Sequence, residues 1–136
     1  MTKQPVALLI EDNEQNLYLM RFLLETNGFV VEQARSGRQG LLEAVRLRPD
    51  IILLDIQLPE MDGYAVARAL RAQEGQKDTP IVVVTSYAMV GDREKALASG
   101  ATSYLEKPIN PDTFVEQVRR HLPAVFCRRG DEGERT

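Results

Sequence analysis

The run Ile51-Ile52-Leu53-Leu54-Asp55 constrains the fold of this chain more than any other stretch. It is too short to span a bilayer and too uniformly apolar to alternate between core and solvent. It therefore predicts a strand that is buried on both faces of a parallel sheet. In open α/β sheets, ligands bind just beyond the carboxyl ends of such strands. Asp55 occupies that position and is the first candidate for a functional residue.

Two other apolar runs end in polar residues in the same way. Residues 6–10 (VALLI) lead into Glu11 and Asp12, and residues 81–84 (IVVV) lead into Thr85. The carboxyl ends of parallel strands meet at one edge of a sheet, so three carboxylates and a hydroxyl are expected to converge there. We interpret that edge as the functional site.

Strand-like and helix-like segments alternate along the whole chain. Besides the three apolar runs, more polar strands are expected at residues 29–34 and 103–106. The intervening segments have helical spacing of their apolar residues or helical start and stop signals. The helices are expected at residues 13–27, 36–47, 64–73, 92–98 and 110–122.

Local signals set the expected ends of several helices. Asn13 and Ser36 are predicted N-caps, because their side-chain oxygens can accept from the first free amides of a helix. Gly28 is predicted to stop the first helix at its C′ position. Asn110 and Pro111 are predicted to open the last helix as its cap and first residue.

Five strand–helix units with right-handed crossovers predict an α/β fold with a doubly wound, five-stranded parallel sheet and five helices. The first, third and fourth strands are the most apolar, so they belong in the middle of the sheet. The expected strand order is therefore 2-1-3-4-5, which is the flavodoxin-like arrangement. In this order the first and third strands are neighbours, which places Glu11, Asp12 and Asp55 within reach of one another.

Composition narrows the class of protein further. With 136 residues and 43% hydrophobic content, the chain fits one domain, expected over residues 5–122, followed by a flexible charged tail over residues 123–136. The net charge of -3 is too small to indicate a nucleic-acid or membrane partner. Cys127 is the single cysteine, which excludes an internal disulfide. A cytoplasmic location is expected.

A hard divalent cation would relieve the repulsion among the three carboxylates. Mg²⁺ prefers one or two carboxylates together with waters and a phosphate, and Mn²⁺ is expected to substitute for it. The backbone carbonyl of Gln57 lies close enough in sequence to complete the set formed by Glu11, Asp12 and Asp55.

The same edge of the sheet offers groups for a bound phosphoryl group. Asp55 is a potential nucleophile, since aspartyl phosphates are established covalent intermediates. Thr85 supplies a hydroxyl donor, and Lys107 follows the fifth strand with a compact positive charge. Pro108 comes next, and a cis peptide there would direct the lysine inward.

Taken in chain order, these residues resemble the motif set of bacterial two-component response-regulator receiver domains, the CheY-like superfamily. The resemblance covers residues 5–122. Within it, residues 11–16 (EDNEQN) are similar to DivK-type single-domain regulators and to receivers of hybrid histidine kinases. The features that carry the resemblance are Glu11-Asp12, Asp55, residues 58–63 (LPEMDG), Thr85 and Lys107-Pro108.

The resemblance implies a role for each residue of the acidic edge. Asp55 would be the phosphorylation site and would accept the phosphoryl group from a phosphohistidine of a histidine kinase or a histidine phosphotransfer protein. Asp12, Asp55 and the Gln57 carbonyl would bind Mg²⁺, with Glu11 reaching the ion through water.

The resemblance also implies roles around the phosphoryl group. Thr85 and Lys107 would contact its oxygens, and Tyr104 stands where the family keeps its switch aromatic. Gln57 and Tyr87 stand at positions that tune dephosphorylation in this family.

The expected function is therefore a phospho-acceptor switch in a phosphorelay, not a turnover enzyme. The chain has one histidine, His121 on the last helix, so the phosphoryl donor is expected to be another protein. Output would pass to an unknown downstream protein through the face formed by the fourth helix, fifth strand and fifth helix, which is also the expected face of a homodimer. Direct DNA binding is not expected.

Three alternatives stay open at this stage. The sequence could be a receiver excised from a hybrid histidine kinase or a multidomain regulator. It could be a Mg²⁺-dependent phosphatase with an aspartate nucleophile, although such enzymes usually carry an acid two residues later, where this chain has Gln57. A flavin-binding electron carrier would share the fold, and absorbance of the purified protein would detect it.

Overall fold

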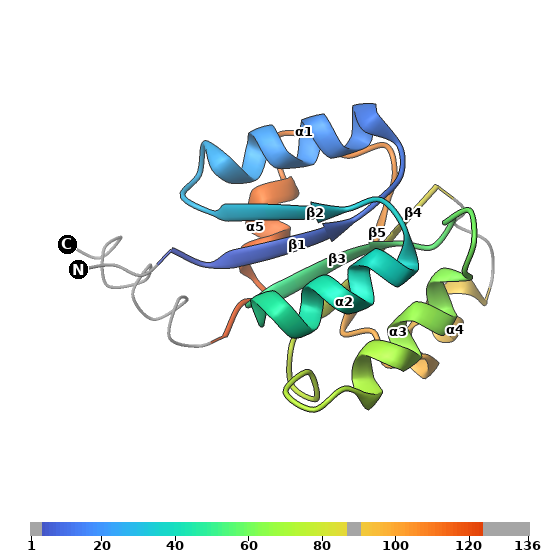
Figure 1. Ribbon diagram of the computed structural model, residues 1–136. Coiled ribbons are helices and arrows are strands. Elements are labelled where there is room, and N and C mark those ends of the chain that lie inside the picture. Colours follow the sequence, from blue (N-terminus) through green and yellow to red (C-terminus); the bar gives the residue numbers. More distant parts are fainter. Residues whose placement is uncertain (1–3, 87–90, 124–136) are drawn as a thin grey trace.

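A single parallel sheet organises the computed structural model, which describes residues 4–86 and 91–123 (Figure 1). The strand order is β2-β1-β3-β4-β5, which confirms the predicted order. The strands are β1 (Val6–Ile10), β2 (Val30–Ala34), β3 (Ile51–Asp55), β4 (Ile81–Thr85) and β5 (Ser103–Glu106). The helices are α1 (Glu14–Glu25), α2 (Gly37–Leu47), α3 (Gly63–Ala72), α4 (Asp92–Ala98) and α5 (Phe114–Arg119).

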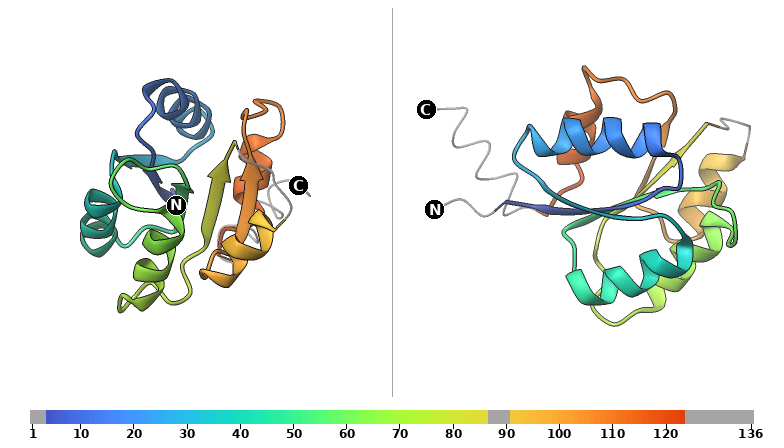
Figure 2. Two further views of the ribbon diagram at one scale, coloured as in Figure 1. Left: turned by 90° about the vertical axis from the view of Figure 1, so that its right-hand side faces the viewer. Right: turned by 45° about the horizontal axis from the view of Figure 1, so that its top comes forward.

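Helices cover both faces of the sheet, so the fold has three layers (Figure 2). Helices α1 and α5 lie on one face, and α2, α3 and α4 lie on the other. Side chains of successive strand residues point to opposite faces. Accordingly, Leu9 and Leu53 belong to the core under α1 and α5, whereas Leu8 and Ile52 belong to the core on the other face. Burial on both faces explains why these strands are continuously apolar.

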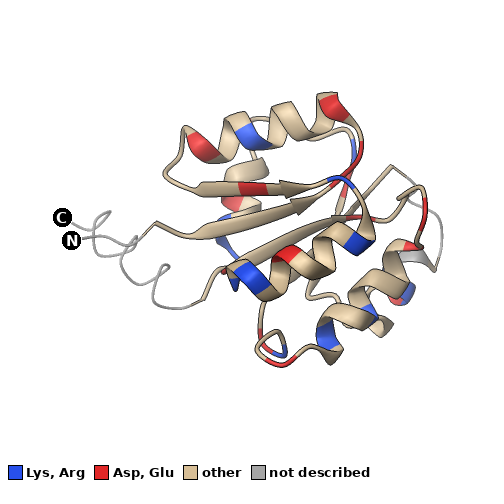
Figure 3. Cartoon of the chain, in the orientation of Figure 1, with Lys and Arg blue, Asp and Glu red and all other residues tan. Residues whose placement is uncertain are grey.

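The strand register brings the carboxyl ends of the central strands level with one another. Ile10 lies opposite Leu54, and Asp55 lies opposite Val84. Charged residues are concentrated on the helices and loops, while most of the sheet carries none (Figure 3). Every helix in the described segments is too short or too polar to cross a membrane.

Two predicted helix caps are confirmed. The Asn13 side chain accepts a hydrogen bond of 2.9 Å from the Asn16 amide at the start of α1. The Ser36 hydroxyl accepts one of 3.1 Å from the Gln39 amide at the start of α2. Both bonds satisfy an amide that has no partner within its own helix.

The regular part of the last helix begins later than predicted. Asn110 and Pro111 do not open α5, which begins at Phe114 with Thr113 as its N-cap. The Asn110 side chain accepts from the Asp112 amide at 3.0 Å, and the Asn110 backbone carbonyl accepts from the Phe114 amide at 2.9 Å. These are the bonds that an N-cap residue makes, so Asn110 caps the turn that leads directly into α5.

The predicted stop of α1 at Gly28 is confirmed, because the Phe29 amide donates to the Leu24 carbonyl at 3.0 Å and the Gly28 amide donates to the Glu25 carbonyl at 3.3 Å. The helix ends at Glu25 with Thr26 as its C-cap, and the Thr26 hydroxyl donates back to the Phe22 carbonyl at 2.8 Å. Gly28 comes two residues after the cap and has a positive φ of 92°. These two bonds and the left-handed backbone of Gly28 form the glycine-closed helix end that the sequence predicted, and they turn the chain into β2.

Candidate functional site

Three carboxylates meet where β1 and β3 end side by side. Glu11, Asp12 and Asp55 each offer a carboxylate oxygen, and these oxygens lie within 4.8 Å of one another. The parallel pairing of β1 with β3 produces this convergence, because the carboxyl ends of both strands lie at the same edge of the sheet. The structure thus brings together the three acidic residues selected from the sequence.

The three carboxylates differ in their exposure to solvent. Glu11 and Asp55 are 1% and 3% exposed, whereas Asp12 is exposed. Burying two carboxylates costs free energy unless a cation compensates for their charge. The site therefore needs a positive group beside its buried pair.

Lys107 provides that positive group. Its Nζ lies 2.9 Å from Glu11 Oε1 and 3.5 Å from Asp55 Oδ1. The Lys107 amide also donates to the Thr85 carbonyl at 2.8 Å, which ties the chain after β5 to the end of β4. The peptide bond between Lys107 and Pro108 is cis, as predicted.

Burial raises the pKa of Glu11 from 4.5 to about 7. Lys107 lowers this pKa by favouring the charged form, and Asp55 raises it by hydrogen bonding and by repulsion. Burial therefore favours the protonated form of the Glu11 carboxyl more than in a solvent-exposed glutamate. A divalent cation at this edge would favour its ionised form.

The loop between β3 and α3 is held against the nucleophile candidate by close backbone contacts. The Gln57 amide donates to Asp55 Oδ1 at 3.1 Å, and the Gly63 amide donates to the Ile56 carbonyl at 3.1 Å. A Cβ on Gly63 would lie 2.5 Å from Ile56 Cα and 2.8 Å from the Asp55 carbonyl oxygen. Glycine is therefore required where the loop folds back over the strand end.

Sequence reasoning missed a side-chain contact across the opening of the site. The Ser86 hydroxyl donates to Gln57 Oε1 at 2.9 Å and so links the ends of β3 and β4. Neither residue type carries a pattern that predicts this bond. Only the position of each residue just after neighbouring strands could have indicated it.

Thr85 and Tyr104 occupy the adjacent strands β4 and β5. Thr85 is 1% exposed and Tyr104 is half-buried. Tyr104 is paired with Val83 in the neighbouring strand, and Thr85 follows Val83 by two residues. The side chains of Thr85 and Tyr104 therefore lie on the same face of the sheet. Tyr87 is predicted, with Gln57, to tune dephosphorylation. It lies outside the described residues.

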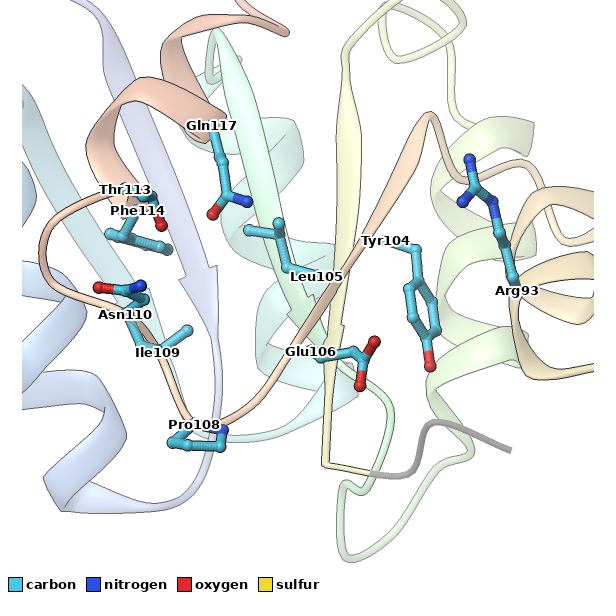
Figure 4. A pocket seen from close by; sticks show the side chains of 10 residues that line it. All are labelled: Arg93, Tyr104, Leu105, Glu106, Pro108, Ile109, Asn110, Thr113, Phe114 and Gln117. Atoms are coloured by element: carbon cyan, nitrogen blue, oxygen red, sulfur yellow. The ribbon is translucent and has the colours of Figure 1, made fainter. Parts of the chain in front are cut away.

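A cavity of about 530 Å³ lies beside Tyr104, between β5 and the helices α4 and α5. Figure 4 shows Arg93 of α4 beside the tyrosine, and Gln117 of α5 on the opposite side of β5. The sequence singled out Tyr104 but gave no signal for the cavity, which depends on the spacing of three separate elements.

The fold and the acidic edge define a class of protein. Residues 7–119 match the family model described as the response regulator receiver domain. The chain therefore belongs to the receiver domain family of two-component signalling. Receiver domains are signalling proteins, not turnover enzymes, and they interact with histidine kinases or histidine phosphotransfer proteins.

Among characterised proteins, the chain is similar to the polar-differentiation response regulator DivK. It is 39% identical to DivK of Brucella ovis over 122 residues, which is 90% of this chain and 98% of that protein. It is 38% identical to DivK of Brucella anthropi over 116 residues, which is 85% of this chain and 94% of that protein.

Solved structures show the same fold. The chemotaxis response regulator CheY4 of Vibrio cholerae superposes with a TM-score of 0.84 at 32% identity, over 88% of this chain and all of that one. The receiver domain of sensor histidine kinase PA1611 from Pseudomonas aeruginosa has a TM-score of 0.80 at 36% identity, over 87% and 97% of the two chains. That receiver has a magnesium ion coordinated in its active site cleft.

Proposed function

We propose that this chain is a phospho-acceptor whose Asp55 takes a phosphoryl group from a phosphohistidine of a histidine kinase or a histidine phosphotransfer protein. The observation that carries the proposal is the buried Asp55 carboxylate, with Glu11 and Asp12 on one side and the Lys107 ammonium 3.5 Å away. An Asp55 oxygen forms the new bond to phosphorus, the bond from phosphorus to the donor nitrogen breaks, and its electron pair returns to the imidazole. The chain catalyses this transfer to itself, and water later hydrolyses the acyl phosphate to free Asp55 and inorganic phosphate, so the chain is a phospho-acceptor and not a turnover enzyme.

The carboxylate cluster fits a magnesium ion. The donor set consists of the carboxylates of Asp12 and Asp55 together with Glu11, whose pKa is raised to about 7. A hard divalent cation would stabilise the ionised form of all three. Asp12, Asp55 and the Gln57 carbonyl would hold the ion, with Glu11 reaching it through water, and Mn²⁺ would substitute. When bound, the ion neutralises charge that develops on the phosphoryl oxygens. The magnesium in the PA1611 receiver supports this assignment.

Lys107 and Thr85 are proposed to bind the phosphoryl oxygens. Lys107 is already held at the site by its ion pairs, and only 11% of its side chain is exposed. Once the phosphoryl group is on Asp55, the Lys107 ammonium would form an ion pair with the phosphoryl oxygens. Its ion pairs with the Glu11 and Asp55 carboxylates would weaken accordingly. The Thr85 hydroxyl, at the end of the adjacent strand β4, would complete the contacts.

The switch is proposed to run from Thr85 to Tyr104. Movement of Thr85 toward the phosphoryl group would change the packing around Tyr104 and the cavity beside it. The face formed by α4, β5 and α5 would then bind a downstream protein, or a second copy of this chain. We further propose that residues 5–122 form the receiver, whether it acts alone or as part of a hybrid kinase or multidomain regulator. The predicted tail at residues 123–136 lies, apart from Pro123, outside the described residues.

Intact mass spectrometry tests the proposed function. The protein is incubated with Mg²⁺ and acetyl phosphate, a small-molecule phosphoryl donor, and weighed. Wild type should gain one phosphoryl group, and excess EDTA should prevent the gain. Asp55→Asn should gain nothing, whereas the control Asp62→Asn, which alters an exposed carboxylate in the same loop, should behave as wild type. Equal gain by Asp55→Asn and wild type would contradict the proposal.

A further inference from the structure

Arg71 of α3 joins two segments that are distant in sequence. Its guanidinium donates to the carbonyls of Gln76, at 2.8 Å, and Thr79 in the connection from α3 to β4. It also donates to the Gly100 carbonyl at 2.8 Å and to the Thr102 hydroxyl at 3.1 Å, in the connection from α4 to β5. The half-buried guanidinium of Arg71 thus donates to four oxygen acceptors, two in the connection from α3 to β4 and two in the connection from α4 to β5.

The chemistry of arginine suits this arrangement. The guanidinium presents its donors in a rigid plane, so several acceptors can be fixed at once with little loss of side-chain freedom. Burial lowers the pKa of Arg71 from its ordinary value, which shows that the group is partly removed from water. Gly100 has a φ of 106°, and a Cβ there would lie 2.6 Å from Arg71 Cγ. The absence of a side chain at Gly100 therefore leaves room for the Arg71 side chain.

The two ends of α4 are held very differently. At the C-terminal end, the Ser99 hydroxyl donates to the Ala96 carbonyl at 2.6 Å and the Ala101 amide donates to the same carbonyl at 3.1 Å. The bond from Arg71 to Gly100 adds to these. At the N-terminal end, the cap is Gly91, which has no side-chain oxygen to accept from the first amides of the helix.

We propose that Arg71 fixes the C-terminal end of α4 as a pivot, so that the N-terminal end moves when Asp55 is phosphorylated. The inference deepens the proposed function and rests on it. Arg93 lies in the first turn of α4 and lines the cavity beside Tyr104 (Figure 4). Movement about the pivot therefore widens or narrows the cavity at its Arg93 side, while the start of β5 keeps its place.

Amide hydrogen exchange, followed by NMR, tests the anchor in the resting protein. The Ala101 and Thr102 amides report the anchored end, since they donate to Ala96 and to Ile81 in β4. Arg71→Met should raise their exchange roughly tenfold, by removing the hydrogen bonds that oppose local opening. Arg71→Lys should give an intermediate rate, because an ammonium lacks the planar fork of donors.

Two controls keep this test interpretable. Arg68→Met removes an exposed arginine one turn earlier on α3 and should leave exchange at Ala101 and Thr102 unchanged. If Arg71→Met does not fold, Arg71→Gln, whose shorter uncharged side chain cannot replace the guanidinium, should raise exchange at Ala101 in the same way. Equal exchange in wild type and in the folded anchor variant would overturn the proposal, whether or not phosphoryl uptake occurs.

The pivot itself is tested in the phosphorylated protein, with uptake checked by mass. In wild type, acetyl phosphate and Mg²⁺ should change exchange at the Lys95 amide, which donates to Gly91, and leave Ala101 and Thr102 unchanged. In Arg71→Met, the change should extend to Ala101 and Thr102. Equal changes at both ends of α4 in wild type would overturn the pivot. Absence of any added mass would instead contradict the proposed function.

Discussion

At the scale of single residues, the acidic edge balances two buried carboxylates against one lysine. Glu11 and Asp55 are almost inaccessible to solvent, and Lys107 lies within 3.5 Å of both. Burial is the main reason that the pKa of Glu11 is raised, and the neighbouring Asp55 adds to the effect while Lys107 opposes it. The resting site is therefore electrostatically unsatisfied in a way that a divalent cation would relieve.

The raised pKa of Glu11 predicts a pH dependence of stability without metal. Between pH 4.5 and about 7 the folded chain holds a proton on Glu11 that the unfolded chain has released. The free energy of unfolding should therefore fall as the pH rises through this window, by roughly 3 kcal/mol for a shift of this size. Urea denaturation in EDTA, at a series of pH values, measures the effect.

Glu11→Gln isolates this contribution, because glutamine keeps the shape of the side chain and does not titrate. The difference in unfolding free energy between wild type and Glu11→Gln should fall as the pH rises. Glu60→Gln, which changes an exposed carboxylate, should follow wild type at every pH. Parallel curves for wild type and Glu11→Gln would show that Glu11 has an ordinary pKa in the fold.

At the scale of elements, the loop from β3 to α3 depends on the close approach of Gly63 to the end of β3. Gly63→Ala would place a Cβ within 2.9 Å of three backbone atoms of Asp55 and Ile56. The backbone has to shift to relieve this contact, so the unfolding free energy should fall by roughly 1–3 kcal/mol. Because the loop carries Gln57, phosphoryl uptake from acetyl phosphate should slow as well.

Gly28→Ala is the matched control for this prediction. Gly28 has a positive φ of 92° but no atom within 4 Å of an added Cβ, and it lies far from the site in the turn before β2. Its substitution should reduce stability through backbone strain and leave phosphoryl uptake unchanged. If both variants slowed uptake equally, the loop contact would not be the reason for the glycine at position 63.

Elements also show what the sequence could and could not predict. The three apolar runs predicted the central strands and their order, because a strand buried on both faces has few alternatives. The start of α5 was predicted too early, because Asn110 caps a turn at residues 111–113 that precedes the regular helix. The bond from Ser86 to Gln57 and the contacts of Arg71 depend on loop conformations that no local pattern specifies.

At the scale of the whole molecule, the candidate site exists only in the folded chain. Glu11 and Asp12 are separated from Asp55 by more than 40 residues, and the crossover through α1, β2 and α2 brings them together. The convergence of these acids followed from the parallel order of the strands, so the sequence predicted it. The placement of Lys107 between two of them did not follow from the order alone.

A ligand that binds only the folded chain stabilises it by mass action. Mg²⁺ should therefore raise the free energy of unfolding, by about 2.7 kcal/mol at a hundredfold excess over its Kd. Thermal denaturation with increasing Mg²⁺ measures this effect. Asp12→Ala should abolish most of it, whereas Glu74→Ala, an exposed substitution in the connection that follows α3, should not. Equal stabilisation of Asp12→Ala and wild type would place the ion elsewhere.

The central claim is that Asp55 itself carries the phosphoryl group. Borohydride reduces an acyl phosphate to the corresponding alcohol, so trapping after acetyl phosphate and Mg²⁺ should convert the phosphorylated aspartate to homoserine. Tandem mass spectrometry of the digested protein then locates the change. The account predicts homoserine at position 55 alone, and none when EDTA is present. Homoserine at Asp12 or Asp62 with Asp55 unchanged would contradict it.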